Sequence, residues 1–262
     1  MQPLYTLDNT TAAYQLNWSV ALFGTVKLPP AANWLNELKA ATVNDGVRIL
    51  EYHAPSPNVA QFLVSSKPAN APSDIVRSVK GRWQYLIRDD VPKAFRRNYS
   101  ISSVGEANSQ VLQSYVAQQP QRHPMADARV QERIRVLQFH DPGVELHRDQ
   151  FSSHGRFIHN LQIVLENESG WNEIRHEVLG RSRQMIIDAV AKHAWRLARI
   201  GLLSNHLHIL LAADVRESPG SVALSLMNNL AYAQAMKPVF RFSYYAGTFG
   251  TYDRSAIRRR LQ

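Results

Sequence analysis

The stretch Ser204-Asn205-His206-Leu207-His208-Ile209-Leu210-Leu211 decides the fold, because a related stretch, Pro57-Asn58-Val59-Ala60-Gln61-Phe62-Leu63-Val64, occurs earlier in the chain. A shift of 147 positions brings the two together, so that Val59 and Gln61 stand where the later stretch has its two histidines. Residues i and i+2 of a strand point to the same face. The later copy therefore presents two imidazoles side by side, and the earlier copy presents none.

The elements around both stretches follow one order, which indicates a duplicated unit. Residues 14–23 and 157–165 have the alternation and composition of strands, and Asn17 corresponds to Asn160 at a shift of 143. In the first unit we expect a helix over residues 34–42, strands over 48–52 and 60–65, and a second helix from Pro72 onward. In the second unit, a helix over residues 181–199 precedes the histidine strand. The repeat predicts an α+β fold with two tandem units.

A polar, proline-interrupted segment separates the two units. The last helix of the first unit is expected over residues 109–119, because Pro120 cannot continue it. We therefore expect a first domain over residues 1–119, a linker over 120–153 and a second domain over 154–262. Within the linker, residues 126–137 have the pattern of a helix.

Composition limits the class of protein. A chain of 262 residues with 45% hydrophobic content and no cysteine can form one or two cores, but it cannot form disulfides, thiolate nucleophiles or cysteine-based zinc sites. It has no apolar run long enough for a membrane span and no basic region ahead of an apolar stretch at the N-terminus. We expect an intracellular protein without a membrane partner.

The net charge of +9 and a pI near 9.9 indicate either a polyanion partner such as nucleic acid or a solvated basic surface. Trp83, Tyr99, Tyr244 and Tyr245 are considered as base-stacking platforms, although each is also a candidate for the core. The basic residues considered for nucleic-acid contact are Lys80, Arg82, Arg96, Arg97, Arg181, Arg183, Arg258 and Arg259, with Arg260 beside them.

The histidine pair can hold a divalent metal, since His206 and His208 share one face of a strand. The spacing alone leaves another interpretation open, because histidines at strand ends are often structural or simply exposed. The order of motifs decides between these interpretations. Asn205-His206-Leu207-His208, followed by a proline-started helix, resembles the histidine strand of the single-tyrosine HUH transposases, which move insertion sequences as single-stranded DNA.

The first unit resembles the same family along its length. The matching motifs are Pro57-Asn58, Phe62-Leu63-Val64-Ser65, Ser78-Val79-Lys80-Gly81, Tyr99, Ser103-Val104-Gly105 and Ser114-Tyr115-Val116-Ala117-Gln118-Gln119. The resemblance implies two tandem HUH, ferredoxin-like domains, each an antiparallel sheet with helices, that form a pseudo-dimer within one chain. It also implies a prokaryotic, cytoplasmic, nucleoid-associated location.

The resemblance assigns roles that neither unit can fill alone. It implies that Tyr115 is the nucleophile and Gln119 the third metal ligand, and residues at i and i+4 share a helix face. In the second unit, a shift of 145 puts Arg260 at the place of Tyr115. The first unit thus has the tyrosine without the histidines, and the second has the histidines without the tyrosine. We expect one composite active site, made of Tyr115, Gln119, His206 and His208.

The activity implied is metal-dependent nicking and joining of single-stranded DNA by a transposase. A tyrosine hydroxyl has a pKa near 10 and needs a positive centre nearby to act as a nucleophile at neutral pH. Mg²⁺ or Mn²⁺ would supply it, and attack would give a 5′-phosphotyrosine intermediate and a free 3′-OH. The partner implied is single-stranded DNA with a hairpin. The alternatives are a host-adopted nickase and a non-catalytic DNA- or RNA-hairpin-binding protein.

Overall fold

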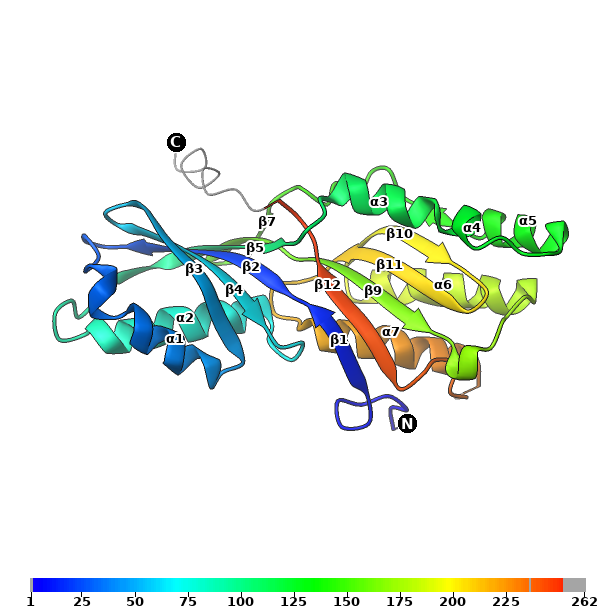
Figure 1. The fold of residues 1–262 in the computed structure, drawn as a ribbon, viewed down its shortest axis with the longest axis horizontal. Helices are drawn as coiled ribbons and strands as arrows, with labels where there is room; N and C mark the ends of the chain where they lie inside the picture. Colours follow the sequence, from blue (N-terminus) through cyan, green and yellow to red (C-terminus); the bar gives the residue numbers. More distant parts are fainter. Residues whose placement is uncertain (1, 236, 252–262) are drawn as a thin grey trace.

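The computed structural model describes residues 2–235 and 237–251 and contains two six-stranded mixed sheets with helices packed against them (Figure 1). This confirms the α+β class and the two tandem units. No helix in the described ranges is long and apolar enough to cross a bilayer.

The first sheet belongs mainly to the N-terminal half. Its strand order is β3-β4-β2-β5-β8-β7. Helices α1 (Leu35–Val43) and α2 (Pro72–Ile87) lie together along one face of it in Figure 1. Its core contains the fully buried rings of Trp18, Phe62 and Trp83. The strands are β2 (Asn17–Gly24), β3 (Val47–Ser56), β4 (Val59–Ser66), β5 (Phe95–Val104), β7 (Gln150–Phe151) and β8 (Gly155–Ile158), with a short 3-10 helix at Ala31–Asn33.

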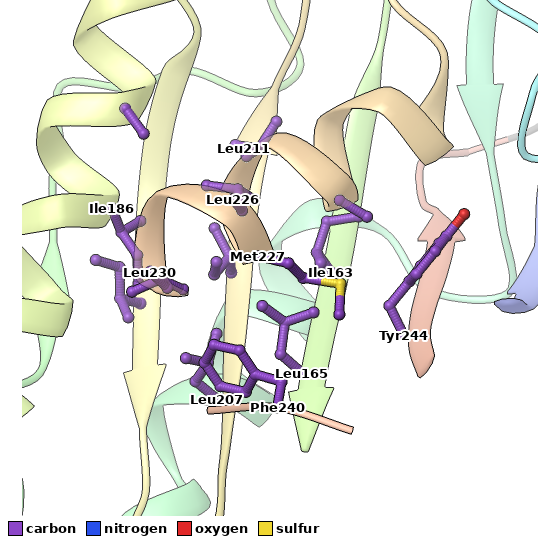
Figure 2. Packing of buried hydrophobic residues seen from close by; sticks show 14 of the residues in the cluster. Ile163, Leu165, Ile186, Leu207, Leu211, Leu226, Met227, Leu230, Phe240 and Tyr244 are labelled. Atoms are coloured by element: carbon purple, nitrogen blue, oxygen red, sulfur yellow. The ribbon is translucent and has the colours of Figure 1, made fainter. Parts of the chain in front are cut away.

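The second sheet has the order β1-β12-β9-β11-β10-β6. Helices α6 (His176–Lys192) and α7 (Pro219–Ala233) cover one face, where Ile163, Leu211 and Leu226 belong to one apolar cluster (Figure 2). The strands are β1 (Thr11–Gln15), β6 (Phe139–His140), β9 (Asn160–Glu166), β10 (Arg196–Leu202), β11 (His206–Ala212) and β12 (Ser243–Thr248), with a 3-10 helix at Glu168–Gly170.

Helix α3 (Ser109–Ala117) covers the opposite face of the second sheet, although it follows the first unit in sequence. Its Leu112 and Val116 form a separate cluster with Ala198 and Leu210, which alternate with the residues that face α6 and α7. Helices α4 (Gln119–Arg122) and α5 (Ala128–Val136) follow it (Figure 1). The N-terminal half thus places a helix over the strand that carries the histidines.

Each half also contributes a strand to the sheet of the other half. Strand β1 pairs in parallel with β12, and β8 pairs in parallel with β5. Ala12 lies opposite Tyr244, and Gly155 lies opposite Tyr99. The two pairings correspond in the repeat, because a shift of 143 relates Ala12 to Gly155 and a shift of 145 relates Tyr99 to Tyr244. The division into residues 1–119, 120–153 and 154–262 therefore stays a proposal, since each sheet draws on both outer parts.

Two expected strands and one expected helix of the two sheets differ from the structure. The strands expected over residues 14–23 and 157–165 are each interrupted, at Leu16 and at His159, where the chain passes from one sheet to the other. The helix expected over residues 181–199 ends at Lys192, and β10 begins at Arg196 after Ala194 adopts a positive φ of 56°. Pairing of β10 with β11 and β6 overrides the helical pattern there.

The segments that follow β5 and β12 meet at Gly105 and Gly250, which correspond at the shift of 145. The Gly105 nitrogen donates to the Gly250 oxygen at 3.0 Å. A Cβ on Gly105 would lie 2.3 Å from the Thr248 oxygen, and Gly250 has a φ of +140° that side chains rarely adopt. Neither position leaves room for a side chain without movement of the backbone.

His159 is fully buried at its crossing. Its Nδ1 contacts the Asp214 carbonyl oxygen at 2.9 Å, its Nε2 has no partner, and its ring lies edge-on to Trp18. Burial lowers the pKa of His159 from 6.5 to about 4. The imidazole is therefore neutral in the folded protein at neutral pH.

We expect acid to destabilise the protein through this residue. Between pH 6.5 and pH 4 the unfolded state binds a proton that folded His159 does not, so the stability present above pH 6.5 is lost as the pH falls. The shift corresponds to roughly 3 kcal/mol in the free energy of unfolding. Urea denaturation of the wild type and His159→Leu at several pH values measures it, leucine being the counterpart residue at position 16. Equal pH dependence in both proteins would contradict the assignment.

Candidate active site

The helix that carries Tyr115 is held over the second sheet by local and long-range contacts. The Asn108 side chain accepts a hydrogen bond from the Val111 nitrogen and caps the helix N-terminus. Val116 is buried against Gly201, where a Cβ would lie 2.5 Å from the valine Cγ1. With Val116 on the buried face, the neighbouring Tyr115 is 37% exposed.

The structure brings Tyr115 and the histidine strand into contact. The Tyr115 and His208 ring centroids are 5.8 Å apart with an interplanar angle of 86°. The centroids of His206 and His208 are 5.1 Å apart. A phenol from the first half and two imidazoles from the second half thus lie next to one another in a single chain.

Both imidazoles are neutral at pH 7. Burial, followed by the proximity of His206 and His123, lowers the pKa of His208 to about 4. Burial is also the largest cause of the lowered pKa of His206, with His123 adding to it and Glu166 opposing it. Neutral imidazole is the form that ligates a metal.

One nitrogen of His208 has an open position. Its Nδ1 contacts the side-chain amide of Gln162 at 3.3 Å, whereas its buried Nε2 has no hydrogen-bond partner. An amide group donates to Nδ1 in one orientation and accepts from it in the other. In the second orientation Nε2 keeps a free lone pair, which suits a metal ligand.

Gln119 is close to Tyr115 but has a different orientation from the one its predicted role needs. It is buried, and its Nε2 donates to the Tyr115 carbonyl oxygen at 3.2 Å. The predicted helix over residues 109–119 is wrong at its end, because α3 stops at Ala117 and Gln119 begins α4, where Pro120 fits the first turn. Within the described ranges no hydrogen bond joins Gln119 to either histidine.

Two residues that sequence analysis missed complete the cluster. The Arg122 guanidinium carbon lies 5.3 Å from the Tyr115 ring centroid, and its Nη2 donates to the Gln118 Oε1 at 3.0 Å. The His123 and His206 ring centroids are 5.2 Å apart. Both residues follow Gln119 at helical spacing, which was the available signal, but they lie in a stretch interpreted as a linker.

The corresponding place in the first half has lost the imidazoles. Val59 packs with Ala21 and Phe23, and the Gln61 Nε2 donates to the Ser19 Oγ at 3.1 Å. The repeat relates Ser19 to Gln162 and Gln61 to His208, so a neutral hydrogen bond replaces the histidine contact. Arg260, the residue expected at the place of the tyrosine, lies outside the described residues.

The basic residues considered for nucleic-acid contact differ in their surroundings. Lys80 donates to the carbonyl oxygens of Arg96 and Arg97, Arg82 pairs with Asp45 at 2.8 Å, and Arg183 lies over the Phe139 ring. Arg96, Arg97 and Arg181 are exposed. Arg258 and Arg259 lie outside the described residues.

The aromatic residues considered as stacking platforms fall into two groups, those in a core and those at the surface. Trp83 and Tyr244 are buried in the two cores, so the core alternative holds for them. Tyr99 lines a hollow of about 560 Å³ at the junction of β5 and β8. Arg96, Arg97, Arg156 and Phe151 line it too, and Phe151 is 77% exposed. This basic and aromatic hollow is the clearest candidate surface for DNA in the first half.

The structure contains two repeated α+β units, with a tyrosine helix over a strand that carries a His-x-His pair, which is the arrangement expected from the resemblance to the single-tyrosine HUH transposases. A family model described as "Transposase IS200 like" matches residues 33–119. The match lies within the first half and agrees with the resemblance that the motifs indicated there, and the histidine strand lies outside the matched residues.

Solved structures show weaker similarity. A protein from Deinococcus radiodurans R1 described as a transposase is 17% identical, with a TM-score of 0.32, over 41% of this chain and 92% of its own. A REP-associated tyrosine transposase bound to a REP hairpin is 10% identical, with a TM-score of 0.31, over 45% of this chain and 68% of its own. No curated protein sequence matches the chain significantly.

Proposed function

We propose that this protein is a single-stranded DNA endonuclease and strand transferase of transposase type with one composite active site. The contact between Tyr115 and His208, at 5.8 Å between ring centroids, is the observation that carries the proposal. It joins residues from halves that each lack part of the machinery. The match of residues 33–119 to a transposase family model supports the substrate class.

The chemistry proposed is attack of the Tyr115 hydroxyl oxygen on a backbone phosphorus. The bond from phosphorus to the tyrosine oxygen forms, the bond to the 3′ oxygen breaks, and a 5′-phosphotyrosine and a free 3′-OH result. The phenolic proton is lost and the 3′ oxygen gains one, so the step is balanced without water. Rejoining is the same step in reverse with another 3′-OH.

Arg122 is placed to act on the same phosphate, since its guanidinium lies beside the Tyr115 ring. Arginine matches the geometry of phosphate oxygens and keeps its charge at neutral pH. We assign Arg122 the role of holding the scissile phosphate near the tyrosine hydroxyl. The Gln118 side chain, which accepts from Arg122 at 3.0 Å, limits how far the guanidinium moves.

The donor set fits Mg²⁺ or Mn²⁺ as the metal that the family implies. In the described part of the chain, no three His, Cys, Asp or Glu side chains form a metal-binding group. The ligands proposed are His206, His208 and Gln119, with the unpartnered Nε2 of His208 as the supporting observation. The Gln119 amide has to turn from the Tyr115 carbonyl oxygen to take part. When bound, the metal supplies a positive charge that stabilises charge developing on the phosphate oxygens.

The partner proposed is single-stranded DNA that carries a hairpin, bound by one chain acting as a pseudo-dimer. The exposed Arg96 and Arg97, beside Phe151, offer phosphate and base contacts on the first half. The net charge of +9 favours association with a polyanion. Cleavage in the second half would then be guided by DNA held in the first.

Replacing both Arg96 and Arg97 by alanine is expected to weaken DNA binding in a salt-dependent way. Loss of two phosphate contacts lowers the slope of log affinity against log salt by about 1.4 for a single strand. Fluorescence anisotropy with a labelled oligonucleotide over a salt series measures it. Arg77→Ala with Arg88→Ala is the control, because these exposed arginines pair with Asp74 and Asp89. Equal slopes in both double variants would contradict the assignment.

Incubation with end-labelled single-stranded oligonucleotides, with and without Mg²⁺ or Mn²⁺, tests the proposed function. The expected result is a protein–DNA adduct that survives denaturation and depends on the metal, with the label mapped to the peptide containing Tyr115. DNA that flanks the gene, tested as single strands of either polarity, is the substrate to try first. A stable complex without any adduct would reject catalysis.

Non-catalytic binding of a DNA or RNA hairpin is the second candidate. Two observations favour it. The first half lacks both histidines, and the Gln119 amide donates to the Tyr115 carbonyl oxygen, an orientation that does not suit a metal ligand. A host-adopted nickase shares the chemistry of the first candidate but needs only one cleavage, which suits a single site. The adduct assay separates binding from catalysis, and strand transfer to a second oligonucleotide separates a transposase from a nickase.

A further inference from the structure

A pocket of about 490 Å³ lies beside His206 at the end of the second sheet, on the side that α6 and α7 cover. His206 belongs both to its lining and to the cluster around Tyr115. The wall comes from the segment after β9, the segment between β10 and β11, helix α6 and the segment after α7. Its volume lies within the range of about 300–1,000 Å³ that small-molecule sites occupy.

The pocket combines an apolar floor with a polar rim. Leu179, Leu207 and Phe240 are buried members of the floor, whereas Arg181 and Gln234 stand at the rim. This mixture suits a flat ring with polar edges. Arg175 also lines the pocket, but it pairs with Glu173 at 2.6 Å. Arg181 and Lys237 are the other basic residues of the lining and Glu168 is acidic, so charges of both signs surround an apolar floor, which suits a base better than phosphate alone.

Trp171 gives the pocket an exposed aromatic wall. Its side chain is 60% exposed, whereas the other four tryptophans, all within the described ranges, are at most 6% exposed. An apolar ring of this size at the surface loses the free energy of burial that its counterparts gain. Single-stranded nucleic acids bind by stacking bases on such exposed aromatic side chains.

The first half provides an internal comparison. A pocket of about 470 Å³ lies at the corresponding place and is lined by Leu28 and Val59 with several prolines. At the shift of 143, Trp171 corresponds to Leu28, which is 8% exposed, and at 147 His206 corresponds to Val59. The exposed tryptophan and the imidazole are thus found in the same half, whereas the other pocket has leucine and valine at those positions and the partly buried Tyr52 as its aromatic residue.

We propose that the pocket beside His206 binds a nucleobase of the single-stranded substrate, from a nucleotide next to the scissile phosphate. The base stacks on Trp171, and Arg181 and Gln234 contact its polar edge. The inference rests on the proposed function, because it places the base beside the phosphate that Tyr115 attacks. The pocket then contributes to the choice of cleavage position.

Tryptophan fluorescence tests the proposal without the reaction. The protein is titrated in EDTA with a thymidine oligonucleotide, a mixed-sequence oligonucleotide and an abasic sugar-phosphate oligomer of equal length. Stacking is expected to quench the Trp171 emission with the first two probes and not with the abasic oligomer. Trp171→Phe should remove the quenching but keep most of the affinity, whereas Trp171→Ala should weaken binding about 5- to 150-fold. Tyr85→Ala, at a 63% exposed aromatic on α2, is the control.

The outcomes separate this inference from the proposed function. Quenching that persists unchanged in Trp171→Phe, or that is equal with the abasic oligomer, would overturn the pocket assignment even if an adduct forms. Trp171-dependent quenching together with no adduct under any metal condition would retain the pocket and reject the catalytic function. Loss of base dependence in the Trp171→Ala variant, with the Tyr85→Ala variant unchanged, supports the pocket.

Discussion

Tyr115→Phe is expected to abolish the covalent protein–DNA adduct while leaving DNA binding intact. The variant removes the one oxygen that forms the bond to phosphorus, and loss of a nucleophile lowers rates by about 10⁴-fold or more. Folding should change little, because the ring is 37% exposed and its hydroxyl makes no hydrogen bond with any described residue. Denaturing gel electrophoresis with labelled DNA measures the adduct, and anisotropy measures binding.

The control is Tyr232→Phe, which removes a hydroxyl from a 60% exposed tyrosine on α7. This variant should form the adduct at the wild-type rate. An adduct that persists in Tyr115→Phe, mapped to another residue, would show that the nucleophile is elsewhere. The contact of Tyr115 with His208 would then have only a structural role.

His208→Gln is expected to remove metal binding and the metal-dependent adduct together. Glutamine is the residue that the repeat places at position 61, where its Nε2 donates to the Ser19 Oγ, so the change imitates the half that lacks the imidazoles. Altering groups that merely support a ligand costs 10–100-fold in metal affinity, so losing the ligand should cost more than about 100-fold. Titration calorimetry with Mn²⁺ measures the affinity, and the adduct assay measures the reaction.

Gln61→Ala is the matched control in the other half, since Gln61 is equally buried and lies at the corresponding position of β4. It should leave Mn²⁺ affinity and the adduct unchanged. Far-ultraviolet circular dichroism should show that His208→Gln remains folded, because the substitution keeps a polar side chain of similar length. Wild-type Mn²⁺ affinity in His208→Gln would reject the metal assignment.

The repeat was readable from sequence because it depends on local patterns. Asn17 and Asn160 both open a strand, and Pro72 and Pro219 both begin a helix, so a constant shift found the two units. The sequence did not predict the last residue of the helix that carries Tyr115. Pro120 stops one helix and fits the first turn of another, and the sequence does not distinguish these uses.

Parts of the candidate site were outside the reach of sequence. Arg122 and His123 are an ordinary polar pair in the chain, and they join the site only because α4 brings them to Tyr115 and His206. Trp171 has no motif around it. The proposed ligand role of Gln119 remains a prediction, since its amide contacts the Tyr115 carbonyl oxygen.

Sequence alone determined the duplicated α+β unit, the resemblance of the first half to a transposase family and the residue types available for chemistry, because periodicity and motif spacing depend on near neighbours. The tertiary structure decided that β1 and β8 exchange sheets and that α3 of the first half covers β10 and β11 of the second. Those arrangements depend on which apolar faces and strand edges pair across more than a hundred residues. Only their combined burial places the Tyr115 ring against His208.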